Sequence, residues 1–504
     1  MFCKLNSYSL NGVNALPIDV EIDLQDGLPG FDIVGLPDSA VKEAKERVKS
    51  AIKNSGFHFP ICHITINLAP ADIKKEGCLY DLPIALGILC CLGVFPAQAL
   101  NHRVFIGELA LDGSIRGVRG LLPLLCSMSD YPIQYIIPNE NHAEASLLHN
   151  VEIYLAHHLR EVVAYINQEG SLKSCLSLEP TPSNTLPPID YSDVRGQVHA
   201  KRGLLLCAAG YHNAILIGPP GSGKTMLAQR LPTILPPPTE KECIEITKIY
   251  SVANQLSDYQ IIKQRPFRAP HHTISNLGLT GGGIHPKPGE ISLAHLGVLF
   301  LDELLEFNKQ ALEILRQPLE SHSITLSRAQ ISLTYPAHFL FLSASNPCPC
   351  GYYPDTSRCT CSLQSIKKYL SKLSAPLIDR VDIHLETHVP KLSELESSDT
   401  ISSQDMVKLV QKAHQKQNQR FRDTTIQYNS QIPTQLITSY CPITPKAKSL
   451  LNEWFETSTA SIRVYDKILR LARTIADVDD YNIIDTPQIA EAIQYRLLDR
   501  QFWM

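Results

Sequence analysis

Two kinds of apolar pattern dominate the first third of the chain. Apolar and polar residues alternate at Ile18–Ile22 and His63–Leu68, which predicts two half-buried strands. Ser39–Ser55 has lysine and glutamate on one helical face and alanine, valine and isoleucine on the other, which predicts an amphipathic helix. The longest apolar run, Leu82–Phe95, is shorter than the ~20 residues of a membrane span. It predicts a buried helix, and residues 1–175 are expected to form one domain of mixed strands and helices.

A proline-rich stretch ends this region. Leu178–Pro188 contains four prolines in eleven residues, and proline cannot continue a helix or an inner strand. We therefore expect a linker at residues 176–188. Beyond it, continuous apolar runs predict strands of an α/β block over residues 189–390, at Ala214–Ile217, Val298–Leu301 and Phe339–Ser343. Residues 391–504 have a helical pattern with few strand signals.

The composition limits the classes of protein to which the chain can belong. The chain has 504 residues, 44% of them apolar and 19% charged, which is typical of a globular protein with several domains. The net charge is −4, so any contact with nucleic acid must come from local basic surfaces. Met1–Ser7 contains no apolar signal segment, and the fourteen cysteines are scattered over the chain. We expect a cytoplasmic protein with reduced thiols and no membrane partner.

A phosphate-binding motif follows the strand predicted at Ala214–Ile217 and precedes a helix. Glycines let backbone N–H groups surround phosphate oxygens, Lys224 can neutralise the β- and γ-phosphates, and the Thr225 hydroxyl can bind Mg²⁺. The alternative is a glycine-rich turn between a strand and a helix. The whole eight-residue pattern favours the nucleotide site: Gly218, Pro219, Pro220, Gly221, Ser222, Gly223, Lys224 and Thr225.

A second motif supplies two carboxylates. The apolar run Val298–Leu301 is followed by Asp302 and Glu303, as expected for a central strand that ends beside the nucleotide. Asp302 is expected to hold Mg²⁺ through water, and Glu303 to act as general base toward the attacking water. Together the two motifs predict hydrolysis of a nucleoside triphosphate.

With these motifs the sequence resembles AAA+ ATPases, and more narrowly the ComM/YifB family of magnesium-chelatase-like proteins. The resemblance covers nearly the whole chain. It is carried by six stretches: Gly27–Asp38, Asn67–Asp72, Arg268–Thr273, Gly281–Gly283, Pro288–His295 and Asn346–Gly351.

The resemblance implies a fold and an activity. The fold would be α/β, with an α+β Lon-protease-like (S5-like) domain at 1–175, an AAA+ core at 189–390 and a helical lid at 391–504. The core would contain a helix-2 insert and a pre-sensor-1 hairpin. The activity would be that of an ATP- and Mg²⁺-dependent DNA helicase, in a ring of six subunits, that drives branch migration in natural transformation.

The family pattern also implies roles for three polar residues. Asn346 fits the sensor-1 position, where a side-chain amide orients the attacking water or the γ-phosphate. Arg380 resembles the arginine finger that one subunit supplies to its neighbour's ATP, and Arg463 resembles the sensor-2 arginine of the lid. Guanidinium groups suit both roles because they bind phosphate oxygens bidentately. The alternative for either arginine is a surface salt bridge.

Two elements are expected to face DNA. Ser323–Leu326 and Ile331–Tyr335 alternate with period two around a turn that contains Arg328, which predicts a hairpin. The Gly-, His- and Pro-rich segment Phe267–Gly297 resembles the helix-2 insert, in which we expect a structural or pore-loop role for His271 and His272 rather than metal binding. The alternative is that both elements only pack one subunit against another.

A basic stripe recurs every four residues of a predicted lid helix: Lys408, Lys412, Lys416 and Arg420. No acidic residue lies between Asp405 and Asp423, so on a helix the four residues form a positive stripe whose members repel one another. We expect it to contact DNA or an acidic neighbouring subunit. The alternative is a solvated face of the lid.

Four cysteines within fourteen residues, Cys348, Cys350, Cys359 and Cys361, are spaced C-x-C-x₈-C-x-C. Four thiolates at this spacing can close a tetrahedral Zn²⁺ site, although C-x₂-C is the commoner arm. The alternative is a set of free or redox-sensitive thiols. Zinc would brace the loop that follows Asn346.

The N-terminal region resembles a Lon protease without its catalytic pair. In Lys74–Ala85 the place of the nucleophilic serine falls near Asp81, and Arg119 stands where the lysine is expected. Arginine does not deprotonate at working pH, and Cys78 has no evident base, so we expect a scaffold. A DNA-stimulated ATPase is therefore the leading hypothesis. The alternatives are a chelatase motor subunit that serves insertion of Mg²⁺ into porphyrin, and an ATP-dependent protease.

Overall fold

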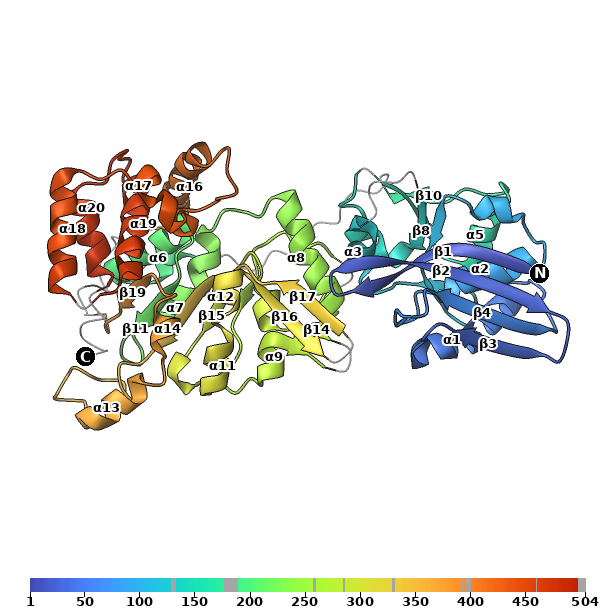
Figure 1. Cartoon of the computed structure of the whole chain (residues 1–504), viewed down its shortest axis with the longest axis horizontal. Helices are drawn as coiled ribbons and strands as arrows, with labels where there is room; N and C mark the ends of the chain where they lie inside the picture. Colours follow the sequence, from blue (N-terminus) through green and yellow to red (C-terminus); the bar gives the residue numbers. More distant parts are fainter. Residues whose placement is uncertain are drawn as a thin grey trace. The chain divides into compact units, whose positions relative to one another are not determined.

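The computed structural model describes residues 1–127, 133–149, 151–175, 189–256, 260–283, 286–328, 331–390, 394, 400–458 and 460–496. Contacts divide the chain into two compact units, which Figure 1 shows in one view. The first comprises Met1–Asn184 and Thr239–Ile262, and the second comprises Thr185–Pro238 and Lys263–Met504. Among the described residues, no helix has the length and apolar character needed to span a membrane. The proline-rich linker predicted at 176–188 lies outside the described residues.

The first unit contains a mixed eight-stranded sheet in the order β10-β9-β8-β5-β1-β2-β4-β3. Its centre is the antiparallel pair β1 (Phe2–Asn11) and β2 (Asn14–Gln25), in which Leu5 lies opposite Val20. Both predicted strands are confirmed, since they lie within β2 and β4. The remaining strands are β3 (Gly30–Val34), β4 (His63–Ala69), β5 (Arg103–Phe105), β8 (Gln134–Pro138), β9 (Glu152–Ala156) and β10 (Lys173–Ser174), and a separate hairpin pairs β6 (Glu108–Leu109) with β7 (Ile115–Arg116).

The two helices predicted in this region are present. Helix α1 (Ser39–Asn54) begins at Asp38, whose carboxylate accepts a hydrogen bond from the backbone N–H of Val41, and its apolar face is buried. Every residue of α2 (Asp81–Cys91) is buried, as its continuous apolar pattern predicts. Three shorter helices complete the N-terminal part of this unit: α3 (Leu121–Cys126), α4 (His142–Ala145) and α5 (Leu159–Ile166).

Helix α8 (Glu240–Ala253) belongs to the first unit, although its residues fall within the 189–390 range that the sequence suggests for the core. It packs against α3. The Ser251 hydroxyl accepts a hydrogen bond from the Gly120 N–H and donates one to Glu144, both at 3.1 Å. Glu144 is buried and accepts further bonds from Asn141 and from the Leu122 N–H, and its burial raises its pKa to about 7.

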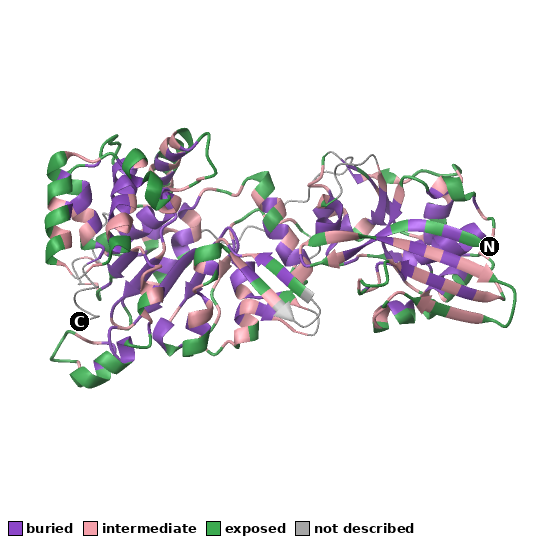
Figure 2. Ribbon diagram, viewed as in Figure 1, coloured by how far each residue is buried: buried purple, intermediate pink, exposed green. Residues whose placement is uncertain are grey.

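The second unit contains a five-stranded parallel sheet in the order β12-β15-β18-β11-β19. The strands predicted at Ala214–Ile217 and Val298–Leu301 are confirmed, and the third is shifted by one or two residues, to Leu340–Ser345. Figure 2 shows the central strands buried along their length. The bounds are β11 (Ala214–Ile217), β12 (Phe267–Arg268), β15 (Val298–Leu301), β18 (Leu340–Ser345) and β19 (Ile383–Glu386). This is the α/β P-loop fold that the sequence predicts.

Helices and two small hairpins surround this sheet. The core helices are α6 (Val198–Gly210), α7 (Lys224–Arg230), α9 (Asn276–Thr280), α10 (Glu290–Leu293), α11 (Lys309–Ile314), α12 (Pro318–Ser321), α13 (Leu363–Leu370) and α14 (Ala375–Ile378). The hairpins pair β13 (Gly281–Gly282) with β14 (Lys287–Pro288), and β16 (Ser323–Arg328) with β17 (Ile331–Pro336). The C-terminal helices are α16 (Ser403–Arg420), α17 (Ile437–Tyr440), α18 (Pro445–Thr457), α19 (Ile462–Val478) and α20 (Thr486–Gln494).

Candidate nucleotide-binding site

The phosphate loop connects β11 to α7 and depends on glycine for its path. A Cβ atom on Gly218 would lie 2.2 Å from the carbonyl oxygen of Thr387, so only glycine allows this close approach. Gly221 and Gly223 have φ of 77° and 85°, in the left-handed region that favours glycine. The sequence motif therefore has the strand–loop–helix context that phosphate binding requires.

Lys224 is held inside the loop by all three hydrogens of its ammonium group. Its Nζ donates to the carbonyl oxygens of Gly218 at 2.7 Å and Pro219 at 2.9 Å, and to Oδ1 of Asn346 at 3.2 Å. Burial lowers the pKa of Lys224, and the carboxylates of Asp302 and Glu303 oppose this shift. The structure thus brings together the lysine of one predicted motif and the predicted sensor amide at the end of β18.

The proposed Mg²⁺ ligands are also adjacent. The Thr225 hydroxyl donates a 2.6 Å hydrogen bond to Oδ2 of Asp302, which follows β15. The two oxygens therefore lie beside one position, where the Thr225 hydroxyl can bind Mg²⁺ directly and the Asp302 carboxylate can bind a water of the ion. Both are the hard oxygen donors that Mg²⁺ prefers, and the residues present therefore fit the metal.

Glu303 has an unexpected partner. It has a φ of 51°, in the left-handed region, and its Oε2 lies 3.2 Å from Nδ1 of His272. The His272 ring contacts those of His271 and Phe307. From the sequence alone, only a structural or pore-loop role is expected for His272, and no local pattern relates it to Glu303. In the structure its imidazole contacts the carboxylate of the predicted general base.

Residues beyond the motif also support the phosphate loop. The hydroxyls of Ser222 and Thr387 lie 2.8 Å apart. The side-chain amide of Gln197 donates to the carbonyl oxygens of Ser222 at 3.0 Å and His388 at 2.5 Å. Gln197 and Thr387 lie far from the motif in the sequence, so sequence reasoning misses both.

The two predicted phosphate-binding arginines lie near one acidic residue. Arg380 forms a 2.5 Å ion pair with Glu320 and donates to the carbonyl oxygen of Pro376 at 2.6 Å. The guanidinium of Arg380 is the main cause of a lowered pKa at Glu320, and Arg463 contributes to the same shift. Arg380 and Arg463 therefore both act on Glu320, which the sequence does not single out.

The exposed part of the basic stripe is neutralised within the lid. Lys408 forms an ion pair with Asp405 at 3.0 Å, and Lys412 and Lys416 both contact Asp480 at 2.7 Å. The two lysine contacts lower the pKa of Asp480 to about 2. Asp480 follows α19, sixty-eight residues beyond Lys412 in the sequence. The spacing of the lysines in the sequence therefore does not show which negative charges face the stripe in the structure.

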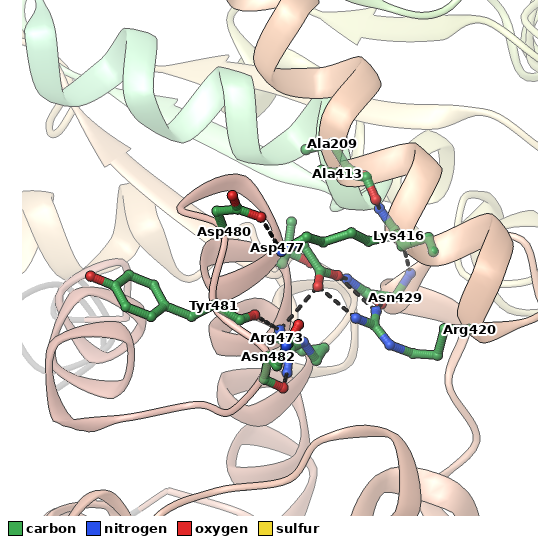
Figure 3. Close-up of polar contacts among 12 residues, drawn as sticks. Ala209, Ala413, Lys416, Arg420, Asn429, Arg473, Asp477, Asp480, Tyr481 and Asn482 are labelled. Atoms are coloured by element: carbon green, nitrogen blue, oxygen red, sulfur yellow. Dashed lines mark hydrogen bonds and ion pairs between the residues drawn. The ribbon is translucent and has the colours of Figure 1, made fainter.

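Arg420, the last residue of the stripe, is part of a buried ionic network (Figure 3). Its guanidinium contacts both carboxylate oxygens of Asp477, at 2.7 and 2.5 Å. Asp477 is fully buried and also accepts hydrogen bonds from Arg473 at 3.0 Å and Asn429 at 2.8 Å. Arg473 is bound in turn to the carbonyl oxygens of Tyr481 and Asn482. These contacts tie α16 to α19.

The predicted hairpin consists of β16 and β17, with the Cα of Arg328 opposite that of Ile331. The side chain of Arg328 and the turn at 329–330 lie outside the described residues. The preceding insert contains α9, α10 and the β13–β14 hairpin. Arg268, near the start of the insert, donates two 2.6 Å hydrogen bonds to Glu290 at the start of α10.

The four cysteines predicted as zinc ligands meet in space. Their sulfur atoms all lie within 4.8 Å of one another, and all four thiols are free. Cys348 is buried, and the other three are partly exposed. The backbone N–H of Tyr352 is the main cause that lowers the pKa of Cys350, to about 6. The structure therefore assembles a set of donors suited to a thiophilic metal.

The first unit offers no protease pair at the positions that resemble one. Asp81 is buried and bound by the guanidinium of Arg47 at 2.6 and 3.0 Å, and burial raises its pKa to about 6. Burial also raises the pKa of Cys78 to about 11, which disfavours the nucleophilic thiolate. Arg119 is exposed and cannot act as a base.

Comparisons with known families match nearly the whole chain. A family model described as magnesium chelatase, subunit ChlI, matches residues 190–396. Two others, for subunit ChlI of Mg-chelatase and for the ChlI C-terminal region, match residues 20–141 and 400–496.

Several relatives are similar over the same length. The "Uncharacterized protein YifB" of Salmonella typhimurium is 42% identical over 97% of this chain and 96% of the relative. The "Competence protein ComM" of Haemophilus influenzae is 41% identical over 97% and 96%. By contrast, the "Magnesium-chelatase 38 kDa subunit" of Rhodobacter capsulatus is 26% identical over only 34% of this chain and 54% of its own.

Proposed function

Because the chain belongs to the ComM/YifB family of magnesium-chelatase-like AAA+ proteins, we propose that it is an Mg²⁺-dependent ATPase that drives branch migration of DNA. The observation that carries the ATPase proposal is the meeting of four predicted residues at the start of α7 and at the ends of β15 and β18. Lys224 contacts Asn346, and Thr225 contacts Asp302. The work on DNA in natural transformation rests on the family resemblance and on the relative named as a competence protein.

The chemistry follows from the side chains at these strand ends. Lys224 exchanges its contacts with the loop carbonyls for the β- and γ-phosphates, and the backbone of Gly218–Gly223 surrounds their oxygens. Thr225 and Asp302 hold Mg²⁺, which neutralises charge on the phosphates when bound. Glu303, oriented by His272, accepts a proton from the attacking water, and Asn346 orients that water.

We infer from the family resemblance that six subunits form a ring, and the two arginines supply a reason for this assembly. In this proposal Arg380 reaches the γ-phosphate bound by a neighbouring subunit, and Arg463 adds a second guanidinium. Glu320 holds Arg380 until that phosphate competes for it. Because a finger supplied by a neighbour completes the site, hydrolysis requires assembly.

The DNA contacts are assigned to the hairpin and the exposed stripe. Arg328, at the end of β16, is assigned a phosphate contact from the hairpin in this proposal. Lys408, Lys412 and Lys416 bind DNA phosphates when these displace Asp405 and Asp480. Arg420 is excepted, because its charge already serves Asp477 inside the lid. The third cofactor proposed, beside ATP and Mg²⁺, is Zn²⁺ at the four cysteines.

Strand displacement on a branched DNA, with and without ATP, tests this function. The wild type is expected to hydrolyse ATP faster with DNA and to separate the branch. Lys224→Ala is expected to abolish nucleotide binding, and Glu303→Gln to retain binding and stop turnover. Cys62→Ser, a change at a partly exposed thiol in the first unit, is the matched control and is expected to behave as wild type.

Parallel assays with porphyrin and casein test the two competing functions. Stimulation by porphyrin but not by DNA would support a chelatase motor, and degradation of casein would support a protease. Undiminished hydrolysis in both Lys224→Ala and Glu303→Gln would overturn the assignment of the site.

A further inference from the structure

We propose that the four cysteines bind one zinc ion that positions the ATP site, by holding the loop after Asn346 against the phosphate loop. The proposal rests on the assignment of an ATP site under the proposed function. It gives the metal a structural task at the nucleotide site that is separate from the Mg²⁺ bound with ATP.

The spacing of the sulfur atoms matches a tetrahedral zinc centre. The Sγ of Cys348 lies 3.3 Å from that of Cys350 and 3.8 Å from that of Cys359, and the sulfurs of Cys350 and Cys359 lie 3.6 Å apart. With Zn–S bonds of about 2.3 Å, the edge of an ideal S₄ tetrahedron is about 3.8 Å. A disulfide needs sulfurs about 2.05 Å apart, so the observed arrangement favours a shared metal over a covalent pair.

The backbone of the loop is folded for the same task. The backbone N–H of Tyr353 points at the Sγ of Cys348 at 3.4 Å, a contact that stabilises a thiolate ligand. The Gly351 N–H donates to the carbonyl oxygen of Cys348 at 3.0 Å, and the Cys359 N–H to that of Asp355 at 2.8 Å. These bonds turn the chain so that the pair Cys348 and Cys350 faces the pair Cys359 and Cys361.

The zinc loop touches the nucleotide site at two places. Cys348 is buried two residues after Asn346, whose side chain accepts a hydrogen bond from Lys224. Gly351 lies directly against Pro220 of the phosphate loop, because a Cβ atom on Gly351 would be 2.7 Å from Cδ of that proline. The same Cβ would be 3.8 Å from Cγ of Asn346. Movement of the cysteine loop therefore displaces both the sensor amide and the phosphate loop.

Zinc content tests the site. Protein purified without chelators, measured by elemental analysis, is expected to contain one zinc per chain, and Cys359→Ser or Cys361→Ser to lose it. Cys62→Ser is expected to keep it. As a check that does not depend on a variant, cobalt(II) exchanged into the wild type is expected to give the visible absorption of a tetrahedral all-thiolate centre. A wild type without zinc that also gives no such absorption overturns the proposal.

The link between zinc and ATP binding is tested by a variant that leaves the four cysteines intact. Gly351→Ala is expected to retain one zinc per chain and to weaken ATP binding roughly tenfold, since the added methyl group displaces Pro220. Gly77→Ala is the matched control: Gly77 has a φ of 84°, close to the 88° of Gly351, but open space around its Cβ. If Gly351→Ala and zinc-free Cys359→Ser both bind ATP with wild-type affinity, the link between the zinc loop and ATP binding is overturned.

Lys224→Ala separates this proposal from the function on which it rests. It is expected to lose ATP binding and keep its zinc, because Lys224 contacts no cysteine sulfur. If the wild type contains zinc but binds no ATP, the ATPase function and the link between zinc and the ATP site are both refuted. Only the metal site then remains. Loss of zinc in Lys224→Ala would contradict the independence of the two sites.

Discussion

Replacing Arg420 with glutamine decides between two roles for the last residue of the basic stripe. On a DNA-binding face, the change removes one phosphate contact and leaves the fold intact. In the structure, Arg420 instead makes two hydrogen bonds to Asp477, which is fully buried (Figure 3). The glutamine variant leaves that carboxylate with Arg473 and Asn429 as its remaining donors. We therefore expect a loss of stability.

The size of this loss follows from burial. Removing one partner of a fully buried ion pair costs ~3–5 kcal/mol. The side chain of Arg420 is 18% exposed and Asp477 keeps two donors, so we expect about 2–3 kcal/mol. With an unfolding entropy of about 2.1 cal/mol/K per residue, that loss lowers the melting temperature of the second unit by about 3–5 °C. Tryptophan fluorescence measures it well, since Trp454 lies in α18 of the second unit.

Lys408→Gln is the matched control for this experiment. It removes a charge from the same stripe, but Lys408 and its partner Asp405 are largely exposed, so we expect an unchanged melting temperature. If Arg420→Gln melts like the wild type and binds DNA with reduced affinity and a flatter salt dependence, the structural role argued for Arg420 is refuted.

Three further predictions address the lid, the general base and the first unit. Asp480→Asn frees Lys412 and Lys416, so DNA affinity and its salt dependence are expected to rise; unchanged titrations would remove the stripe from the DNA surface. His272→Ala is expected to lower kcat about tenfold at similar KM, and steady-state kinetics equal to wild type would exclude an orienting role. Glu144 has its pKa raised from 4.5 to about 7, so the folded state binds its proton more tightly and stability falls by up to about 3 kcal/mol as pH rises through that interval. Calorimetry across this range is expected to show a weaker pH dependence for Glu144→Gln, and parallel curves would contradict it.

The secondary structure of the parallel sheet can be predicted from the sequence, because its strands are continuous apolar runs bounded by turn residues. Ala214–Ile217 and Val298–Leu301 are buried at every position, so hydrophobicity alone marks their ends. Helix α8 shows the limit of this reasoning. The sequence places its residues in the 189–390 core, but in the structure it packs against α3 and its Ser251 donates to Glu144, both far away in the sequence.

The same distinction separates the predicted site residues from those that sequence reasoning misses. Lys224 and Thr225 belong to one local motif whose spacing is set by the geometry of phosphate binding. His272 and Glu320 act through single contacts with residues on other segments, and no periodicity relates the members of such pairs. Asp480 neutralises Lys412 and Lys416 of the stripe, and it cannot be identified from the sequence for the same reason.

The ion pair between Arg380 and Glu320 has a consequence for the proposed motor. Arg380 is only 16% exposed while Glu320 is 69% exposed, so the acidic partner is the one that solvent, or a competing anion, can reach. A γ-phosphate on a neighbouring subunit has more charge than one carboxylate and binds guanidinium bidentately, so it can displace Glu320. Before assembly, the glutamate keeps the finger neutralised and folded against Pro376. In the proposed ring, assembly around ATP exchanges this internal ion pair for one between subunits, and the exchange links hydrolysis to ring formation.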